Sequence, residues 1–145
     1  MNKILTIVAF SILLSACGED ADNVNKTQVA IQPATSLAEQ QVGGSRAVYL
    51  PDGTGLMLSG KMVKVADKGK FRRHEVAFDN SAQAVESSLY DVLSKAGYSR
   101  KVIETRDGFS KVHYYKDKTP VIGGVFQDST SSAGQSHLSL YWQET

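Results

Sequence analysis

One cysteine, Cys17, is present among the 145 residues of the chain. A single cysteine excludes an intrachain disulfide, so the packing of side chains must stabilise the folded part. If Cys17 is itself modified, no second thiol remains for redox, nucleophilic or metal chemistry. The sequence therefore excludes the function classes that depend on a free cysteine in the folded domain.

Long hydrophobic runs are also missing. The longest nearly continuous apolar run extends from Ile4 to Leu14 and is interrupted only by Thr6 and Ser11. A helix needs about 20 apolar residues to span a bilayer, so this run is too short. One cation, Lys3, precedes the run and small residues follow it. This pattern is typical of a secretory signal peptide.

The run ends in Leu14-Ser15-Ala16-Cys17. This segment resembles the lipobox of bacterial lipoproteins, in which Leu, a small residue, and Ala or Gly precede Cys, and it fits at all four positions. The resemblance implies that residues 1–16 are a signal peptide and that Cys17 carries acyl chains such as palmitate. Cys17 would then anchor the chain to a membrane. Gly18, rather than Asp, follows the cysteine, which resembles lipoproteins sent to the outer membrane, on its periplasmic face.

Net charge is nearly absent from the chain after Ala16, which contains all 15 acids and 15 of the 16 bases. We therefore expect no affinity for nucleic acid, whose binding depends on excess positive charge. The charge is unevenly distributed, however. Residues 17–60 have a net charge of −3 and residues 61–118 a net charge of +5.

Residues 17–46 are polar and contain no aromatic residue, and their few apolar positions show no sustained period. Such a segment cannot bury enough surface to offset the entropy lost on ordering. We therefore expect a flexible tether over residues 17–46 that is dispensable for folding. A single folded domain is expected over residues 47–145, which is enough for one modest core.

The sequence pattern in the first half of this domain predicts a β-hairpin. Apolar and polar residues alternate over Leu56–Ala66 and Phe71–Phe78, with a turn signal at Asp67-Lys68-Gly69 between them. Ser59-Gly60 breaks the alternation of the first segment, which predicts a β-bulge there.

A helix is expected over residues 81–96. Asn80 is the expected N-cap, Gln83 follows at the spacing of a capping box, and Gly97 is placed to end the helix. The opposite face, which includes Glu86, is expected to face solvent. The apolar stripe consists of Val85, Leu89, Val92, Leu93 and Ala96.

Four more strands are expected after the helix, with an Asp107-Gly108 hairpin turn and either a bulge or a close approach at Gly123-Gly124. The expected strands are residues 100–105, 109–115, 121–127 and 138–142. The fold class is therefore α+β. An antiparallel sheet of five to six strands should pack on one helix, with two strands before it and four after it.

The second half of the chain contains a helix with Ala84-Val85, Leu89 and Leu93, a Gly97-Tyr98 stop, the Asp107-Gly108 turn, Lys111-Val112-His113-Tyr114 and a closing Leu-x-Leu strand. This order is similar to the helix-grip domains of the C-subunit lipoprotein of the outer-membrane β-barrel assembly machine. The resemblance implies a helix-on-sheet fold, and no functional residue is transferred from it.

Catalytic and metal-binding spacings are missing from the sequence. His74, His113 and His137 are not spaced as metal ligands, and each is expected to lie on a strand. No Gly-x-Ser-x-Gly elbow is present, and Gly53-Thr54-Gly55 lacks the Lys-Ser/Thr of a phosphate-binding loop. We therefore expect no catalytic residues, no metal and no cofactor.

Two surface features stand out. One is a group of cations in the first hairpin, where they would either discourage edge pairing or bind an acidic partner or lipid headgroups. The other is a possible contact patch at Tyr115 and Tyr141 on the outer sheet face. The hairpin cations are Lys61, Lys64, Lys68, Lys70, Arg72 and Arg73.

These features predict an envelope-anchored, non-enzymatic lipoprotein that binds another envelope protein as an accessory or assembly module. Two alternatives remain open at this point. One is a periplasmic inhibitor or immunity-type protein, and the other is a small-ligand-binding domain with a pocket between helix and sheet. A deep apolar pocket would favour ligand binding, whereas a flat aromatic or basic face would favour docking.

Overall fold

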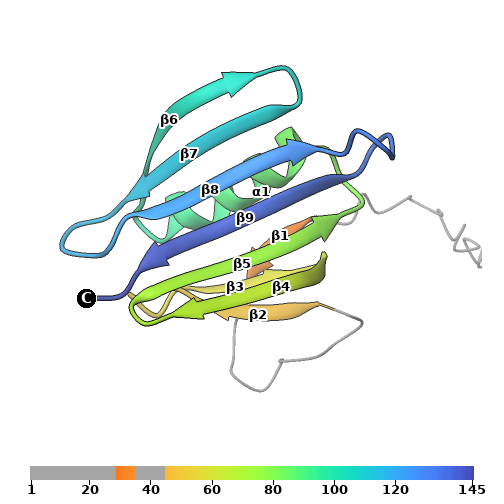
Figure 1. Cartoon of the computed structure of the whole chain (residues 1–145). Helices are drawn as coiled ribbons and strands as arrows, with labels where there is room; N and C mark the ends of the chain where they lie inside the picture. The colour runs from red at the N-terminus through yellow and green to blue at the C-terminus, as the bar shows by residue number, and fades with distance from the viewer. Residues whose placement is uncertain (1–28, 35–44) are drawn as a thin grey trace, which may run out of the picture.

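The computed structural model describes residues 29–34 and 45–145 (Figure 1). Cys17 and the rest of the lipobox lie outside these residues. One helix and two antiparallel sheets make up the described part, which confirms the predicted α+β class and the order of strands around the helix. Within the described ranges, no helix has the length and apolar character needed to cross a membrane.

The larger sheet contains six strands in the spatial order β4-β5-β9-β8-β7-β6, and every neighbouring pair is antiparallel. Asp107-Gly108 joins β6 to β7 as the sequence predicted, with Gly108 at a φ of +63°. The six strands are β4 (Lys61–Lys68), β5 (Phe71–Phe78), β6 (Ser99–Arg106), β7 (Phe109–Tyr115), β8 (Ile122–Asp128) and β9 (Ser136–Gln143).

The helix α1 spans Ala82–Lys95. Its N-cap is Ser81 and not the predicted Asn80: Ser81 has an extended backbone, and its side chain accepts a hydrogen bond from the Ala84 amide. An oxygen of Asp128 accepts another from the Ala82 amide at 2.6 Å. The predicted apolar stripe is largely correct, because Val85, Leu89, Val92 and Leu93 are buried.

A second sheet of three strands, β1-β3-β2, was not predicted. It consists of β1 (Ile31–Pro33), β2 (Arg46–Tyr49) and β3 (Gly55–Leu58). The prediction that residues 17–46 form only a tether is therefore wrong for residues 30–33 and for Arg46. Ala30 and Ile31 are each 1% exposed, and β1 pairs with β3 along its whole length. Two buried residues in a polar segment give too weak a periodic signal to detect.

The predicted strand over residues 56–66 is two strands in two sheets. At Ser59-Gly60 the chain passes from β3 to β4 and does not form the predicted bulge. The Ser59 amide and hydroxyl both donate to the carbonyl of Ala30, at 3.0 and 2.9 Å. Gly60 is required at this crossing because a Cβ would stand 2.5 Å from the carbonyl oxygen of Ala77. The irregularity of β4 lies instead between Met62 and Lys64.

One face of the six-stranded sheet carries the core, and no layer formed by the described residues lies over the other face. In Figure 1 α1 and the three-stranded sheet lie behind the six-stranded sheet, whose free face is turned to the viewer. The space between helix and sheet is filled by large side chains that are almost fully buried. The largest of these are Leu89, Leu93, Tyr114, Phe126 and Leu140.

Candidate functional site

The free face of the six-stranded sheet, here called the outer face, is the strongest candidate for a functional surface. Side chains alternate between the two faces of a strand, and residues paired across strands share a face. Val112 and Tyr114 of β7 are buried against the core, so His113 between them lies on the outer face. This placement confirms the predicted alternation around His113.

Cations dominate the outer face. The strand registers from His113 and Ala77 give the residues of this face on all six strands. Among these strand residues, only Glu75 and Glu104 carry a negative charge. The cations come from four strands and surround the face on both edges. They are Lys61, Lys64 and Lys68 of β4, Arg73 of β5, Lys101 and Arg106 of β6, and Lys111 of β7.

The cations of the predicted basic hairpin are therefore only part of a larger basic surface. One of the hairpin cations, Arg72, does not lie on this surface. Arg72 points to the opposite side of β5, in register with Asp67 and Trp142. Its guanidinium binds Asp67 at 3.0 Å and Glu144 at 2.9 Å, so its charge is locally neutralised. Lys70 lies in the turn between β4 and β5. The other hairpin cations and both predicted tyrosines lie on the outer face.

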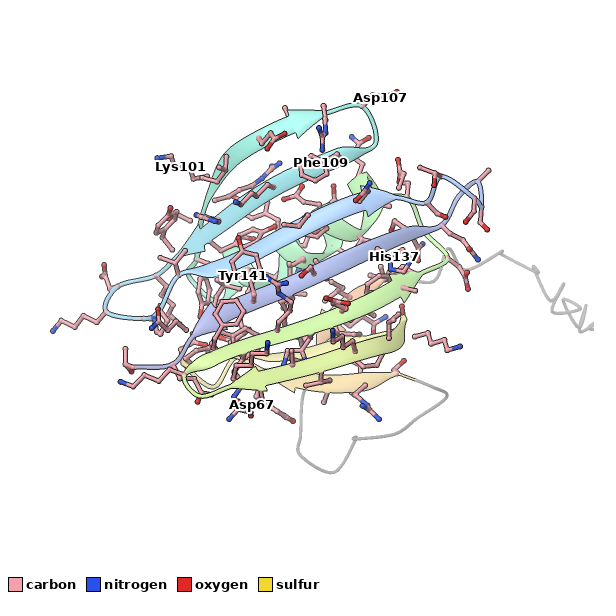
Figure 2. The ribbon with its side chains drawn as sticks, in the orientation of Figure 1. Asp67, Lys101, Asp107, Phe109, His137 and Tyr141 are labelled. Atoms are coloured by element: carbon pink, nitrogen blue, oxygen red, sulfur yellow. The ribbon has the colours of Figure 1, made fainter. Side chains whose placement is uncertain are left out.

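A row of residues crosses this face in the register Lys101–His113–Gly123–Tyr141–Arg73. Gly123 has no side chain, and the ring of Tyr141 occupies the space above it, where any Cβ would overlap the ring. Of the two alternatives predicted at Gly123-Gly124, this confirms the close approach. Figure 2 shows the Tyr141 side chain lying on the sheet.

Tyr141 reaches His113 across Gly123. The Tyr141 hydroxyl lies 3.3 Å from His113 Nε2, and the Tyr115 hydroxyl lies 3.4 Å from His113 Nδ1. Burial, aided by the nearby charges of Lys111 and Lys101, lowers the pKa of His113 below its ordinary value. A neutral imidazole has one donor and one acceptor nitrogen, so the two tyrosines satisfy both.

Arg73 lies beside these rings. Its guanidinium carbon is 5.4 Å from the centroid of Phe71 and 5.7 Å from that of Tyr141, within cation–π range. The two rings stack with their centroids 6.1 Å apart. The outer face thus combines a fixed cation with flat aromatic surfaces towards the end of the sheet where β5 begins.

A groove of about 530 Å³ opens beside this cluster, where the β4–β5 turn, the β7–β8 turn and the end of β9 meet. We call it the C-terminal groove. Phe71, Tyr115 and Val121 are large apolar side chains in this region that remain 36, 37 and 41% exposed. The groove is lined by Lys70, Phe71, His113, Pro120, Val121, Tyr141, Trp142 and Gln143, together with the last two residues.

The three histidines are not brought together. His74 lies on the core side of β5, stacked on Trp142 with ring centroids 5.3 Å apart. His137 lies on the outer face of β9, four residues from Tyr141, which is about 13 Å along a strand. In residues 29–34 and 45–145, no three His, Cys, Asp or Glu side chains are grouped to hold a metal ion.

A second polar region lies between α1 and the β6–β7 hairpin. The prediction that Glu86 faces solvent is wrong: its side chain is 7% exposed. It accepts a hydrogen bond from the Tyr114 hydroxyl at 3.0 Å and binds Arg100 Nε at 3.0 Å. Burial and the Glu86 carboxylate raise the pKa of Tyr114, so its hydroxyl remains a donor. These contacts tie the helix to β6 and β7.

No family model matches the sequence, and neither a curated protein nor a solved structure matches the chain. The outer face itself, with its cations, its aromatic cluster and its groove, is therefore the basis of the proposal below.

Proposed function

We propose that this chain is an envelope-anchored lipoprotein without catalytic activity. It docks through the outer face of its six-stranded sheet on an acidic surface of another envelope protein, as an accessory or assembly module. The lipid on Cys17 would attach the chain to the outer membrane on the periplasmic side. The observation that supports docking most directly is the concentration of seven cations against two carboxylates on a sheet face that no layer covers in the part of the chain that the structure describes.

The physical argument has two parts. Exposed charges of one sign raise the rate at which an oppositely charged partner is captured and reject partners of the same sign. Aromatic and arginine side chains are the residue types that contribute most to binding energy. Arg73, Phe71 and Tyr141 lie together on the outer face, towards the end of the sheet where β5 begins and β9 ends.

Ligand binding between helix and sheet is less well supported. The middle of that space contains Leu89, Leu93 and Phe126, each with less than 1% of its surface exposed. A small ligand there would have to displace packed side chains, which costs several kcal/mol in a well-packed core. A hollow of about 520 Å³ lies at the edge of that space, between the start of α1 and the β6–β7 hairpin, but polar residues such as Gln83 and Arg100 line it and it is not the deep apolar pocket expected of a ligand-binding domain. An inhibitor or immunity-type protein would also act by docking, so the identity of the partner separates it from an assembly module.

The docking proposal is tested by reversing charge at two edges of the face. Lys61 and Lys101 are exposed, lie on β4 and β6, and face no carboxylate across the strands. A photo-reactive residue in place of Ser139, at the middle of the face, would link the partner in whole cells. The double variant Lys61→Glu/Lys101→Glu should reduce this linkage by about tenfold or more, since close charge pairs contribute a kcal/mol or more to binding.

The matched control is Arg46→Glu/Lys95→Glu, which reverses two exposed cations in β2 and at the end of α1, away from the outer face. It should leave the linkage unchanged, and binding by the wild type should weaken as salt screens the exposed charges. Equal linkage in both double variants, without salt dependence, would reject docking through the basic face.

Anchoring is tested separately. Cys17→Ala should leave uncleaved precursor or soluble protein in place of the membrane-bound form, because two or three acyl chains give stable attachment. Mass spectrometry of the wild type should find acyl groups on Cys17. A Cys17→Ala variant that fractionates like the wild type would reject the lipoprotein proposal and leave the docking proposal standing.

A further inference from the structure

We infer that the C-terminal groove is the anchor pocket of the docking surface. It receives one aliphatic or aromatic side chain from an acidic segment of the partner protein. This inference rests on the proposed function, because it specifies the partner chemistry at one end of the same face.

The apolar character of the groove points to an apolar occupant. Phe71 at the start of β5 and Pro120 and Val121 just before β8 border one hollow. Phe71 and Val121 keep 36 and 41% of their surface exposed in the free protein. Covering this surface with a side chain of the partner would remove it from water, which is the main favourable contribution at the centre of an interface.

The polar atoms at the floor of the groove do not oppose an apolar occupant. His113 Nε2 and the Tyr141 hydroxyl already form a pair at 3.3 Å, and the Tyr115 hydroxyl is paired with His113 Nδ1 at 3.4 Å. A buried polar group is costly only when its hydrogen bond is missing. With the imidazole N–H at Nδ1, His113 donates to the Tyr115 hydroxyl and accepts from the Tyr141 hydroxyl at Nε2, so the Tyr141–His113 pair can lose water. The one O–H left over in this trio then belongs to Tyr115, which is 37% exposed and keeps its contact with water.

The charges around the groove select the flanks of the partner segment. Lys70 and Glu144 both line the groove, and the Glu144 carboxylate is already paired with Arg72 at 2.9 Å. Arg73 stacks on Phe71 and Tyr141 at the border. Lys68 and Lys101 stand opposite Phe71 and His113 in the strand register. Carboxylates on either side of the anchor residue would each meet a cation, whereas basic flanks would be repelled.

A partner side chain fits better than a free small molecule. Binding sites for small molecules usually enclose most of the ligand surface. The C-terminal groove is bordered by side chains that are themselves more than a third exposed, so a free ligand would remain largely in water. An anchor residue is enclosed from above by the rest of its own protein, which covers the remaining side.

The test places a photo-reactive phenylalanine analogue at Val121 in the full-length chain, expressed in its own envelope. Mass spectrometry then identifies the residue to which it is linked. The expected product is an aliphatic or aromatic residue of a protein, with Asp or Glu among its immediate neighbours. A link to a lipid, a glycan, or a neutral or basic protein segment would overturn the inference.

Affinity is then measured with a synthetic peptide of the linked segment and the purified full chain. Val121→Asp should weaken binding by about tenfold or more, because it removes apolar contact and adds a negative charge next to acidic flanks. Val29→Asp is the matched control, since Val29 is an exposed valine next to β1, away from the six-stranded sheet. The control variant should bind the peptide like the wild type. Circular dichroism should show that both variants fold like the wild type.

The outcomes separate the two proposals. If Lys61→Glu/Lys101→Glu abolishes linkage from position 139 while Val121→Asp binds normally, docking through the basic face stands and the anchor pocket is rejected. If the double variant and Val121→Asp both bind normally, both proposals are rejected. Loss of binding in Val121→Asp alone supports the anchor pocket and rejects the basic face as the main determinant of docking.

Discussion

The ring of Tyr141 occupies the space above Gly123 on the neighbouring strand, where every other amino acid would carry its side chain. Because of this, the Tyr141 hydroxyl reaches His113 two strands away and closes the floor of the C-terminal groove. The absence of a side chain at Gly123 thus determines the shape of the outer face at this point.

This relationship predicts a strong coupling between the two residues. Gly123→Ala should destabilise the protein by about 1–3 kcal/mol, because the added methyl group forces the Tyr141 ring off the sheet. In a Tyr141→Ala background the same change should be nearly neutral, since the space is then free. A double-mutant cycle from urea unfolding measures the coupling. Additive effects of the two substitutions would show that the ring does not depend on the glycine.

The first strand of the chain should contribute to stability although it lies in a polar segment. Ile31 is 1% exposed, and truncating a buried isoleucine to alanine costs about 2–5 kcal/mol. Ile31→Ala should therefore lower the free energy of unfolding by this amount. Gln32→Ala, at the exposed neighbouring position, is the control and should change it by less than about 0.5 kcal/mol. Equal stability of the two variants would mean that β1 is not part of the folded unit.

Glu86 should be needed for stability, whereas a carboxylate on the free edge should not. Glu86→Ala removes the partner of Arg100 and of the Tyr114 hydroxyl. We expect a loss of about 1–3 kcal/mol, less than for a fully buried pair because Arg100 is partly exposed. The control is Glu104→Ala, whose carboxylate lies 3.9 Å from Arg106 with both side chains exposed. Its effect should stay below about 1 kcal/mol, and thermal unfolding of both variants provides the comparison.

Asp52 should make stability depend on pH in acid. Its side chain is 7% exposed and binds Lys116 Nζ at 2.7 Å. Burial by itself raises the pKa of Asp52, but hydrogen bonds from Lys116 and Thr54 outweigh burial and lower the pKa to about 2. A depressed carboxylate pKa stabilises the folded state above the unfolded value of 3.8, and this stabilisation is lost as the pH falls towards 2.

The wild type should therefore lose about 2 kcal/mol more than Asp52→Asn between pH 4 and pH 2, as measured by urea unfolding at each pH. The control for the removal of one carboxylate is Asp117→Asn, at an exposed position in the same turn as Lys116. If the curve of Asp52→Asn falls as steeply as that of the wild type, the ion pair does not carry this dependence.

Local signals in the sequence determined much of the larger sheet and the helix. Asp107-Gly108 requires a tight hairpin, and the alternation around His113 places Val112 and Tyr114 on the core side. The apolar stripe of α1 required a flat surface to cover. These features depend on residues close together in the chain, so their period and turn chemistry are visible without the fold.

Only the tertiary structure decided the rest, because it depends on pairs that are far apart in the chain. β1 is buried through contacts with β3 some 25 residues away, and Arg72 is neutralised by Glu144 at the other end of the domain. The basic hairpin became a basic face only when β6 and β7 contributed Lys101, Arg106 and Lys111 to the same side. The groove likewise exists because Phe71, Val121 and Tyr141 meet at one end of the sheet. The hydrophobic period of a single segment does not predict such long-range contacts. They depend on strand order and register, which the packing of the whole core selects.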